Sequence, residues 1–240
     1  MSNRRLLSVV IPVFNEGKTI REVLENIFRI NTKDWEREVI VVDDGSTDDT
    51  RERIEETKLL FKEKYPSNAR KLKVIAHKRN LGKGAAVQTG LKMTKGEAIV
   101  IQDADLEYNP REIPKLLAEY SPERVVFGSR NIHAKRQGYR IYVWGDKFLT
   151  TLVNLFLGTN LTDVFTGYKL IPADIFKSIR IKSQGFEFEM ELTIKLLRKK
   201  IIIREVPINY SPRSYQEGKK FTLPKAFIEG FRSLAWLFRK

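Results

Sequence analysis

Two aspartates directly after an apolar segment are the first candidates for chemistry. Asp103 and Asp105 lie two residues apart and follow residues 97–102, which we predict to be a buried strand, so both side chains can point the same way. Two carboxylates on one side of the chain repel each other unless a cation joins them. A Mg²⁺ or Mn²⁺ ion shared with a diphosphate would join them and would stabilise a leaving nucleotide. An aspartate pair can also serve only the solubility of a loop, but its place after a strand favours a site.

Two further polar clusters fall at similar places. Asn15 and Glu16 follow the first apolar run, and Asp43–Ser46 follows the second. The second cluster could bind a base or a ribose through its carboxylates and free amides, or it could be a turn that caps the next helix. Residues 80–84, Asn-Leu-Gly-Lys-Gly, could let the backbone approach a ligand closely. They match neither of the common glycine-rich phosphate-binding patterns, and they could also be an ordinary loop.

The elements that would position these clusters alternate between strands and helices. Strands are expected over residues 6–13, 38–42, 72–76 and 97–102, and helices over 18–30, 47–64 and 84–93. This alternation predicts an α/β fold, with a mostly parallel sheet and helices on both of its faces. Ligands of such sheets bind beyond the carboxyl ends of the strands, which is where the clusters after these strands fall. Their common placement predicts one site.

The second half of the chain is less regular. We expect strands over residues 125–127 and 201–210, and helices over 139–157, 186–199 and 224–240. The prediction is one domain over residues 1–222, followed by an amphipathic helix over 223–240. The apolar faces of the first and last of these helices could belong to the core, to a subunit contact or to a membrane contact. Trp144, Trp236 and the basic residues between apolar ones make a membrane surface a fair competitor to the core.

Composition excludes several kinds of site. The chain has no cysteine, so it forms no disulfide, no cysteine-ligated zinc site and no thiol nucleophile. Its two histidines cannot by themselves build a multi-histidine metal site, so any metal should be a hard cation held by carboxylates. The net charge of +14 suits an anionic partner such as a nucleic acid, an acidic membrane or a phosphorylated substrate. No apolar run reaches the length of a membrane span, and we expect a cytoplasmic protein, peripheral on the cytoplasmic membrane face.

Four motifs in a fixed order resemble those of the family 2 glycosyltransferases, which have the GT-A fold. They are Val9–Glu16, Val41–Asp48, Asn80–Ala86 and Asp103–Asp105. The likeness continues through Gly128–Arg130, Thr162–Lys169, Glu205–Ile208 and Pro212–Lys220. The whole set resembles the dolichyl-phosphate mannose synthase branch, which also includes dolichyl- and undecaprenyl-phosphate glucosyltransferases. It covers roughly residues 6 to 221 of the chain.

This resemblance implies a set of donor-binding residues. The nucleotide base and ribose would be held by Pro12, Phe14, Glu16, Val42 and Asp44. The diphosphate and the metal would meet Asp103, Ala104 and Asp105, with Asp105 as the principal metal ligand. Glu107 stands where mannose synthases usually carry glutamine, and it could still be a metal ligand.

The same resemblance implies residues for the phosphates and the sugar. Arg130, Arg213 and Lys219 would hold the donor diphosphate or the acceptor phosphate, and an arginine suits that role because its guanidinium forms a bidentate fork. Surface charge is the alternative for any one of them. Asp163 matches an aspartate near the sugar.

The reaction implied is the inverting, metal-dependent transfer of a hexose from GDP-mannose or UDP-glucose to a polyprenyl (dolichyl-type) phosphate. An acceptor phosphate is already anionic at neutral pH, so a strong general base is not required. Transfer to a soluble or polysaccharide hydroxyl is the alternative; it would need a base, for which Asp163 is the candidate. A non-enzymatic nucleic-acid binder is suggested by the charge alone, and acidic clusters at a sheet edge argue against it because they repel phosphates. We therefore expect no nucleic acid partner. The donor sugar and the oligomeric state stay open.

Overall fold

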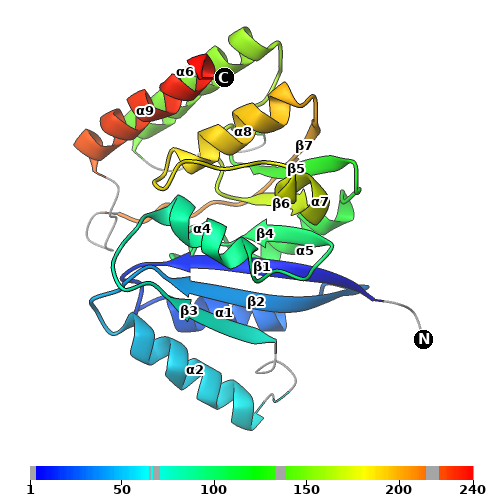
Figure 1. The fold of residues 1–240 in the computed structure, drawn as a ribbon, viewed down its shortest axis with the longest axis vertical. Coiled ribbons are helices and arrows are strands. Elements are labelled where there is room, and N and C mark those ends of the chain that lie inside the picture. The colour runs from blue at the N-terminus through cyan, green and yellow to red at the C-terminus, as the bar shows by residue number, and fades with distance from the viewer. Residues whose placement is uncertain (1–3, 65, 67–70, 133–138, 215–221, 240) are drawn as a thin grey trace.

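A seven-stranded sheet organises the chain (Figure 1). The computed structural model describes residues 4–64, 66, 71–132, 139–214 and 222–239. The strands are β1 (Arg5–Val13), β2 (Trp35–Asp43), β3 (Leu72–Ala76), β4 (Ala98–Ile101), β5 (Arg124–Ser129), β6 (Lys169–Pro172) and β7 (Ile202–Pro207). They lie in the order β3-β2-β1-β4-β6-β5-β7, and every pairing is parallel except the two made by β6.

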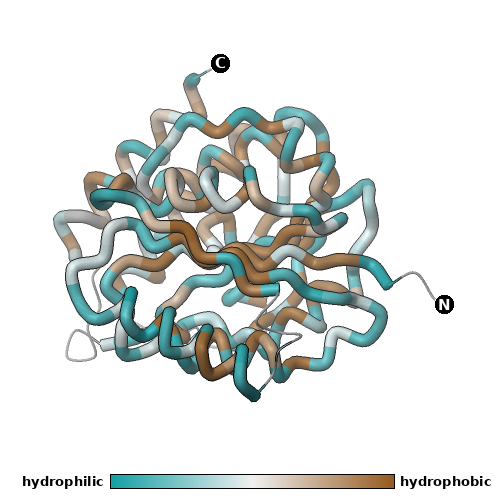
Figure 2. The backbone as a smooth tube through the Cα atoms, turned by 60° about the horizontal axis from the view of Figure 1, so that its bottom comes forward, coloured by the Kyte–Doolittle hydropathy of each residue, from teal (hydrophilic) through white to brown (hydrophobic). Residues whose placement is uncertain are grey.

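Helices cover both faces of this sheet. They are α1 (Ile20–Arg29), α2 (Thr50–Lys64), α4 (Lys83–Leu91), the short η1 (Pro110–Glu112), α5 (Ile113–Ala118), α6 (Arg140–Leu157), α7 (Ala173–Lys177), α8 (Phe188–Arg198) and α9 (Leu223–Phe238). Side chains alternate between the two faces of a strand, and β1 shows this alternation clearly. Val9 packs in the cluster that includes α1, α2 and α5, whereas Val10 packs in the cluster that includes α4, α7 and α8. Figure 2 shows the apolar strands running through the middle of the molecule. The predicted α/β fold is thus confirmed.

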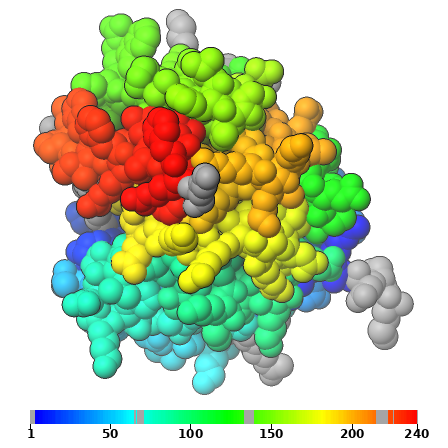
Figure 3. Space-filling view, turned by 45° about the horizontal axis from the view of Figure 1, so that its top comes forward, coloured from blue at the N-terminus to red at the C-terminus, as the bar shows by residue number. Residues whose placement is uncertain are grey.

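Helices α6 and α9 form an additional layer outside α8. They lie side by side at one end of the molecule (Figures 1 and 3). Val153 of α6, Met190 of α8 and Trp236 of α9 are buried together in one apolar cluster. Trp236 and Leu237 therefore pack inward, and the membrane-contact expectation for Trp236 does not hold, because burial in this cluster keeps the ring from solvent. Among the described helices, none combines the length and apolar character that a membrane crossing requires.

The structure contains elements that the sequence patterns did not indicate. Strand β6 runs antiparallel between β4 and β5 and is four residues long, with a lysine at one end and a proline at the other. Helices η1, α5 and α7 are also short. Elements of this length leave too few residues for a periodic pattern. The longer elements were predicted with shifted ends; α2, for example, begins at Thr50 and not at Thr47.

Candidate active site at the carboxyl edge of the sheet

The aspartate pair lies beyond the carboxyl end of β4, as expected, and each aspartate faces a cation of the chain itself. The ammonium of Lys83, at the start of α4, lies 2.7 Å from Oδ1 of Asp103. The guanidinium of Arg213 lies 3.5 Å from Oδ2 of Asp105. Burial raises the pKa of Asp105 to about 7, with the negative charges of Asp103 and Glu107 adding to the effect and Arg213 opposing it. The two carboxylates therefore sit where a further positive charge would relieve their repulsion.

A chain of buried charges continues from Asp103 into the protein. The Lys83 ammonium also contacts Glu189 of α8 at 3.0 Å, and Glu189 accepts a 2.5 Å hydrogen bond from Lys169 of β6. Lys169 has no exposed surface. Burial would lower the pKa of Lys83, but Asp103 and Glu189 raise it well above its usual range, so Lys83 carries its charge. Negative and positive groups alternate along this chain, which therefore has no net charge.

Arg213 connects two segments of this edge that lie far apart in the sequence. Its guanidinium donates to both carboxylate oxygens of Glu16, at 2.8 and 3.0 Å, across 197 positions of sequence. Burial would lower the pKa of Arg213, but the hydrogen bonds to Glu16 and the charges of Asp105 and Glu107 keep it raised. Glu16 and Arg213 were expected to touch different parts of a donor, and the structure brings them together.

Glu107 has its carboxylate oxygens engaged by the segment that follows β7. The Tyr210 hydroxyl donates to one oxygen, and the backbone N–H of Arg213 donates to the other at 2.9 Å. Within the described residues, no three histidine, cysteine, aspartate or glutamate side chains are arranged as a metal site. Asp103 and Asp105 supply the hard oxygen ligands that Mg²⁺ and Mn²⁺ prefer, and their mutual repulsion fits a cation. The expected third ligand, Glu107, is not part of such an arrangement, and its two oxygens accept hydrogen bonds from Tyr210 and Arg213.

Asp44 holds the loop that precedes α4. Its carboxylate accepts hydrogen bonds from the backbone N–H groups of Leu81 and Gly82, at 3.0 and 2.8 Å, and contacts the His77 ring nitrogen Nδ1 at 2.7 Å. The side chain is 4% exposed. Asp44 therefore fixes the position of the Asn80–Gly84 loop, so its expected contact with a nucleotide would be accompanied by a structural role.

The other residues expected to contact the donor lie at the ends of β1, β2 and β4. Pro12 and Phe14 are partly exposed, whereas the side chains of Val42 and Ala104 are buried. A ligand could therefore meet Val42 and Ala104 mainly through their backbone. Asn15 has a positive φ of 53° and accepts a 2.7 Å hydrogen bond from the Thr47 backbone N–H. This contact joins the loops that follow the two strands.

Arg130 and Asp163 form a buried ion pair. Nε and one terminal nitrogen of Arg130 each donate to Asp163 at 2.7 Å, and the Arg130 backbone N–H donates at 3.0 Å. Asp146 lies 3.3 Å from the guanidinium, and the Tyr210 ring lies below it at 5.2 Å. Burial would lower the pKa of Arg130, but Asp163 raises it well above its usual value. The two residues were expected to serve phosphate and sugar separately, and in the structure each holds the other in place.

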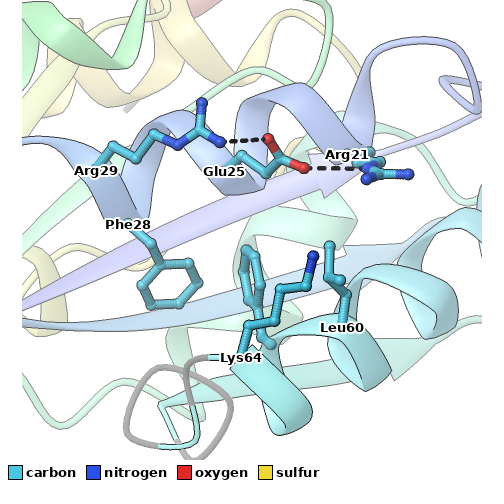
Figure 4. A pocket seen from close by; sticks show the side chains of 7 residues that line it. Arg21, Glu25, Phe28, Arg29, Leu60 and Lys64 are labelled. Atoms are coloured by element: carbon cyan, nitrogen blue, oxygen red, sulfur yellow. Dashed lines mark hydrogen bonds and ion pairs between the residues drawn. The ribbon is translucent and has the colours of Figure 1, made fainter.

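Some candidate residues were missed, and one lies outside the described part. Lys83 was included in a loop without a role, while Lys169, Glu189 and Tyr210 were not identified, since nothing in their local sequence indicates a buried charge or a distant partner. Lys219 falls outside the described residues. A separate groove of about 300 Å³ lies between α1 and α2 (Figure 4) and shares no residue with this edge.

Comparison with known protein families supports the resemblance. The model of glycosyl transferase family 2 matches residues 8–180. A dolichol-phosphate mannosyltransferase of Pyrococcus furiosus is 30% identical over 218 residues, covering 89% of this chain and 58% of the relative. A dolichyl-phosphate β-glucosyltransferase of Saccharomyces cerevisiae is 31% identical over 227 residues, covering 85% of this chain and 66% of the relative. The chain thus spans less than two thirds of the length of both enzymes.

Solved structures share the fold. Glucosyl-3-phosphoglycerate synthase from Mycobacterium tuberculosis, in complex with UDP, superposes with a TM-score of 0.74 at 22% identity. The match covers 98% of this chain and 79% of that protein. The same enzyme has been crystallised with UDP and Mn²⁺ or Mg²⁺.

Proposed function

Because the chain belongs to glycosyl transferase family 2, we propose that it transfers a hexose from GDP-mannose or UDP-glucose to a polyprenyl phosphate, with inversion at the anomeric carbon. The observation that carries the proposal is the pair Asp103 and Asp105 at the carboxyl edge, flanked by Lys83 and Arg213. The names of the two curated relatives support a polyprenyl-phosphate acceptor. The chemistry expected there is the departure of a nucleoside diphosphate, which needs positive charge around its phosphates.

The residues of the edge divide this work. Asp103 and Asp105 would hold Mg²⁺ or Mn²⁺, which when bound supplies positive charge to the leaving diphosphate. Arg213 can offer its guanidinium to phosphate oxygens in place of Glu16. Asp44 keeps the Asn80–Gly84 loop in position. Holding the donor in one orientation is the main catalytic contribution that these groups can make.

The state of Asp163 favours a phosphate acceptor over a hydroxyl. A hydroxyl acceptor requires a base that is free to take a proton. The Asp163 carboxylate instead accepts three hydrogen bonds from Arg130 and is 1% exposed. Both carboxylate oxygens are thus engaged by Arg130 and enclosed by protein, so Asp163 is not placed to take a proton from an acceptor hydroxyl. A phosphate acceptor carries its own negative oxygen and needs no such base.

An exposed apolar face on α6 and α9 supports peripheral attachment to a membrane, where a polyprenyl phosphate resides. Trp144 and Phe148 of α6 are 67% and 61% exposed, and Phe231 and Phe238 of α9 are 74% and 70% exposed. Basic side chains are exposed at Arg140 and Lys147 of α6, at Arg232 of α9 and at Arg239, the residue after α9. Apolar contact and attraction to anionic lipids together are typical of proteins that bind a membrane surface.

Radiolabelled donors test the proposal directly. The full chain is incubated with Mn²⁺, a polyprenyl phosphate and either labelled GDP-mannose or labelled UDP-glucose, and organic extraction then separates lipid-linked label. We expect label in the lipid fraction with one of the two donors and none when EDTA is present. Label that enters only water-soluble or polysaccharide products would overturn the lipid acceptor and favour a hydroxyl. No transfer from either donor would overturn the donor assignment.

A further inference from the structure

We infer that Glu107 is a positioning residue for Arg213 and does not ligate the metal. Glu107 anchors the segment that follows β7, and this anchor sets the place of the Arg213 guanidinium over Asp105. The inference rests on the proposed function, because it assigns to Arg213 the donor's phosphates. It replaces the third metal ligand expected from the sequence with a group that acts on the donor through another side chain.

Three hydrogen bonds attach residues 210–213 to Glu107. The Tyr210 hydroxyl donates to the carboxylate, the Ser211 N–H donates to the Glu107 carbonyl at 3.0 Å, and the Arg213 N–H donates to Oε1 at 2.9 Å. Next to them, Tyr108 and Tyr210 form an antiparallel β-bridge, with their rings 5.1 Å apart. The segment is therefore bound to residues 107 and 108 by backbone and side chain together.

The carboxylate of Glu107 is suited to this anchoring. One oxygen accepts from a hydroxyl and the other from a backbone amide, and these two bonds fix the direction of the carboxylate. Among the described residues no three carboxylates are arranged as a metal site, so turning Glu107 toward a metal would break at least one of these bonds. The Tyr210 ring, which is held against Tyr108 on one side, also lies against the Arg130 guanidinium. Moving Tyr210 would therefore disturb the buried Arg130–Asp163 pair as well. Displacing these donors leaves buried polar groups without partners, which is costly.

The anchor determines what Arg213 can reach. From the position that Glu107 fixes, the guanidinium lies 2.8 Å from Glu16 and 3.5 Å from Asp105. These are the carboxylates that follow the adjacent parallel strands β1 and β4. An arginine on a loose segment would lose side-chain and backbone entropy on each encounter with a diphosphate, whereas an anchored one is already ordered.

Amide hydrogen exchange, followed by NMR without any donor, tests the anchor. Glu107→Ala should speed exchange at Ser211 and Arg213 by about tenfold to 100-fold, because hydrogen bonds to a charged group are lost. Glu107→Gln should restore slow exchange, since the amide keeps an acceptor for the Arg213 N–H and can donate to the Tyr210 oxygen. The amide of Val206, inside β7, should not change. If Ser211 and Arg213 exchange at the same rates in Glu107→Ala as in the wild type, Glu107 does not anchor this segment.

A double-mutant cycle tests whether the anchor acts through Arg213. The affinities for GDP and UDP are measured with saturating Mn²⁺, and Mn²⁺ binding is measured alone. We expect Glu107→Ala to weaken nucleotide binding about tenfold in the wild type and to have no weakening effect when Arg213→Ala is already present, while Mn²⁺ affinity stays within a few-fold. Tyr210→Phe, which keeps every carboxylate, should weaken nucleotide binding in the same way. Loss of Mn²⁺ binding in Glu107→Ala would show that Glu107 is a metal ligand. Equal weakening of nucleotide binding with and without Arg213 would show that Glu107 does not act through Arg213. Either result would overturn the inference. If neither nucleotide binds the wild type, the proposed function fails while the exchange result still decides the anchor.

Discussion

The first and second halves of the chain bring different groups to the same edge. Residues 5–105 contribute Asp44, Asp103 and Asp105, each at the end of a parallel strand. Residues 124–213 contribute Lys169, Arg130 and Arg213, and each of these cations is attached to a carboxylate. Only the second half has the additional layer, α6 and α9, with its exposed apolar face.

This difference shows two ways of positioning a functional side chain. In the first half the parallel sheet places the residues, because strands that run the same way end at the same edge. In the second half the sheet direction is interrupted by β6, and ion pairs and hydrogen bonds do the placing instead. The first half is thus fixed by backbone geometry and the second half by charge pairs, of which the pair of Arg213 with Glu16 reaches back to the first half.

Glu189→Gln is expected to have the largest effect on stability. It removes the charge that holds Lys169, which has no exposed surface, and breaking a buried pair on one side costs about 3–5 kcal/mol of the free energy of unfolding. Denaturant unfolding measures the loss. The double variant Lys169→Met, Glu189→Leu should recover much of it, and the exposed Glu123→Gln should change nothing. If Glu189→Gln has the same free energy of unfolding as the wild type, charge pairing does not hold the second half in place.

Asp105→Asn is expected to have the largest effect on transfer while leaving the fold intact. Removing one electrostatic group from an active site lowers the rate by roughly 10²- to 10³-fold. Transfer from the donor accepted in the wild type, with circular dichroism as the folding check, measures the effect. Asp49→Asn, which alters an aspartate on the exposed surface before α2, is the matched control. Full activity of Asp105→Asn would exclude the first half's strand ends as the catalytic edge.

Asp44→Ala should weaken the binding of GDP or UDP by about tenfold, because two backbone N–H groups of the Asn80–Gly84 loop lose their acceptor. Calorimetry with both nucleotides measures the change. His77→Ala removes one of the partners of Asp44 and should have a smaller effect in the same direction. If Asp44→Ala binds GDP and UDP with unchanged affinity, the Asn80–Gly84 loop does not contribute to the donor site.

Phe231→Ser is expected to have the smallest effect. An exposed phenylalanine that enters the lipid interface contributes about 1.5–3 kcal/mol when fully buried and less when partly buried, so we expect several-fold weaker co-sedimentation with anionic liposomes. Leu59→Ser alters a similarly exposed residue on α2 and is the control. A point substitution is preferred to deletion of α9, because Trp236 and Leu237 belong to the core. If Phe231→Ser and Leu59→Ser co-sediment equally well with the liposomes, α9 does not contact the membrane surface.

The same two halves differ in what the sequence could predict. The strands near residues 6–13 and 38–42 carry valine-rich runs bounded by turns, so their type and approximate ends follow from local pattern. The position of Asp103 and Asp105 follows as well, since it needs only the end of a strand and its direction. The partners of these residues do not follow. That Lys83 faces Asp103 and Glu189, or that Glu107 accepts from Tyr210, depends on how distant segments pack.

The apolar face shows the same limit. The pattern of residues 224–240 predicted an amphipathic helix, and α9 is one. A single apolar stripe cannot reveal that one side is covered by α6 and α8 while another side faces outward. Burial of Trp236 beside exposure of Phe231 and Phe238 is decided by neighbours that lie far away in sequence.

The contact between Glu16 and Arg213 has a consequence for folding kinetics. It closes a loop of 197 residues, and the entropy lost on closure increases with the logarithm of loop length. Contacts of such long range slow folding and form after local ones. During synthesis the N-terminal part of a chain emerges first, so the parallel strands can pair before Arg213 has left the ribosome. The carboxylates at the edge then lack this cation until the segment that carries Arg213 has folded back, so the site proposed for the donor is completed late.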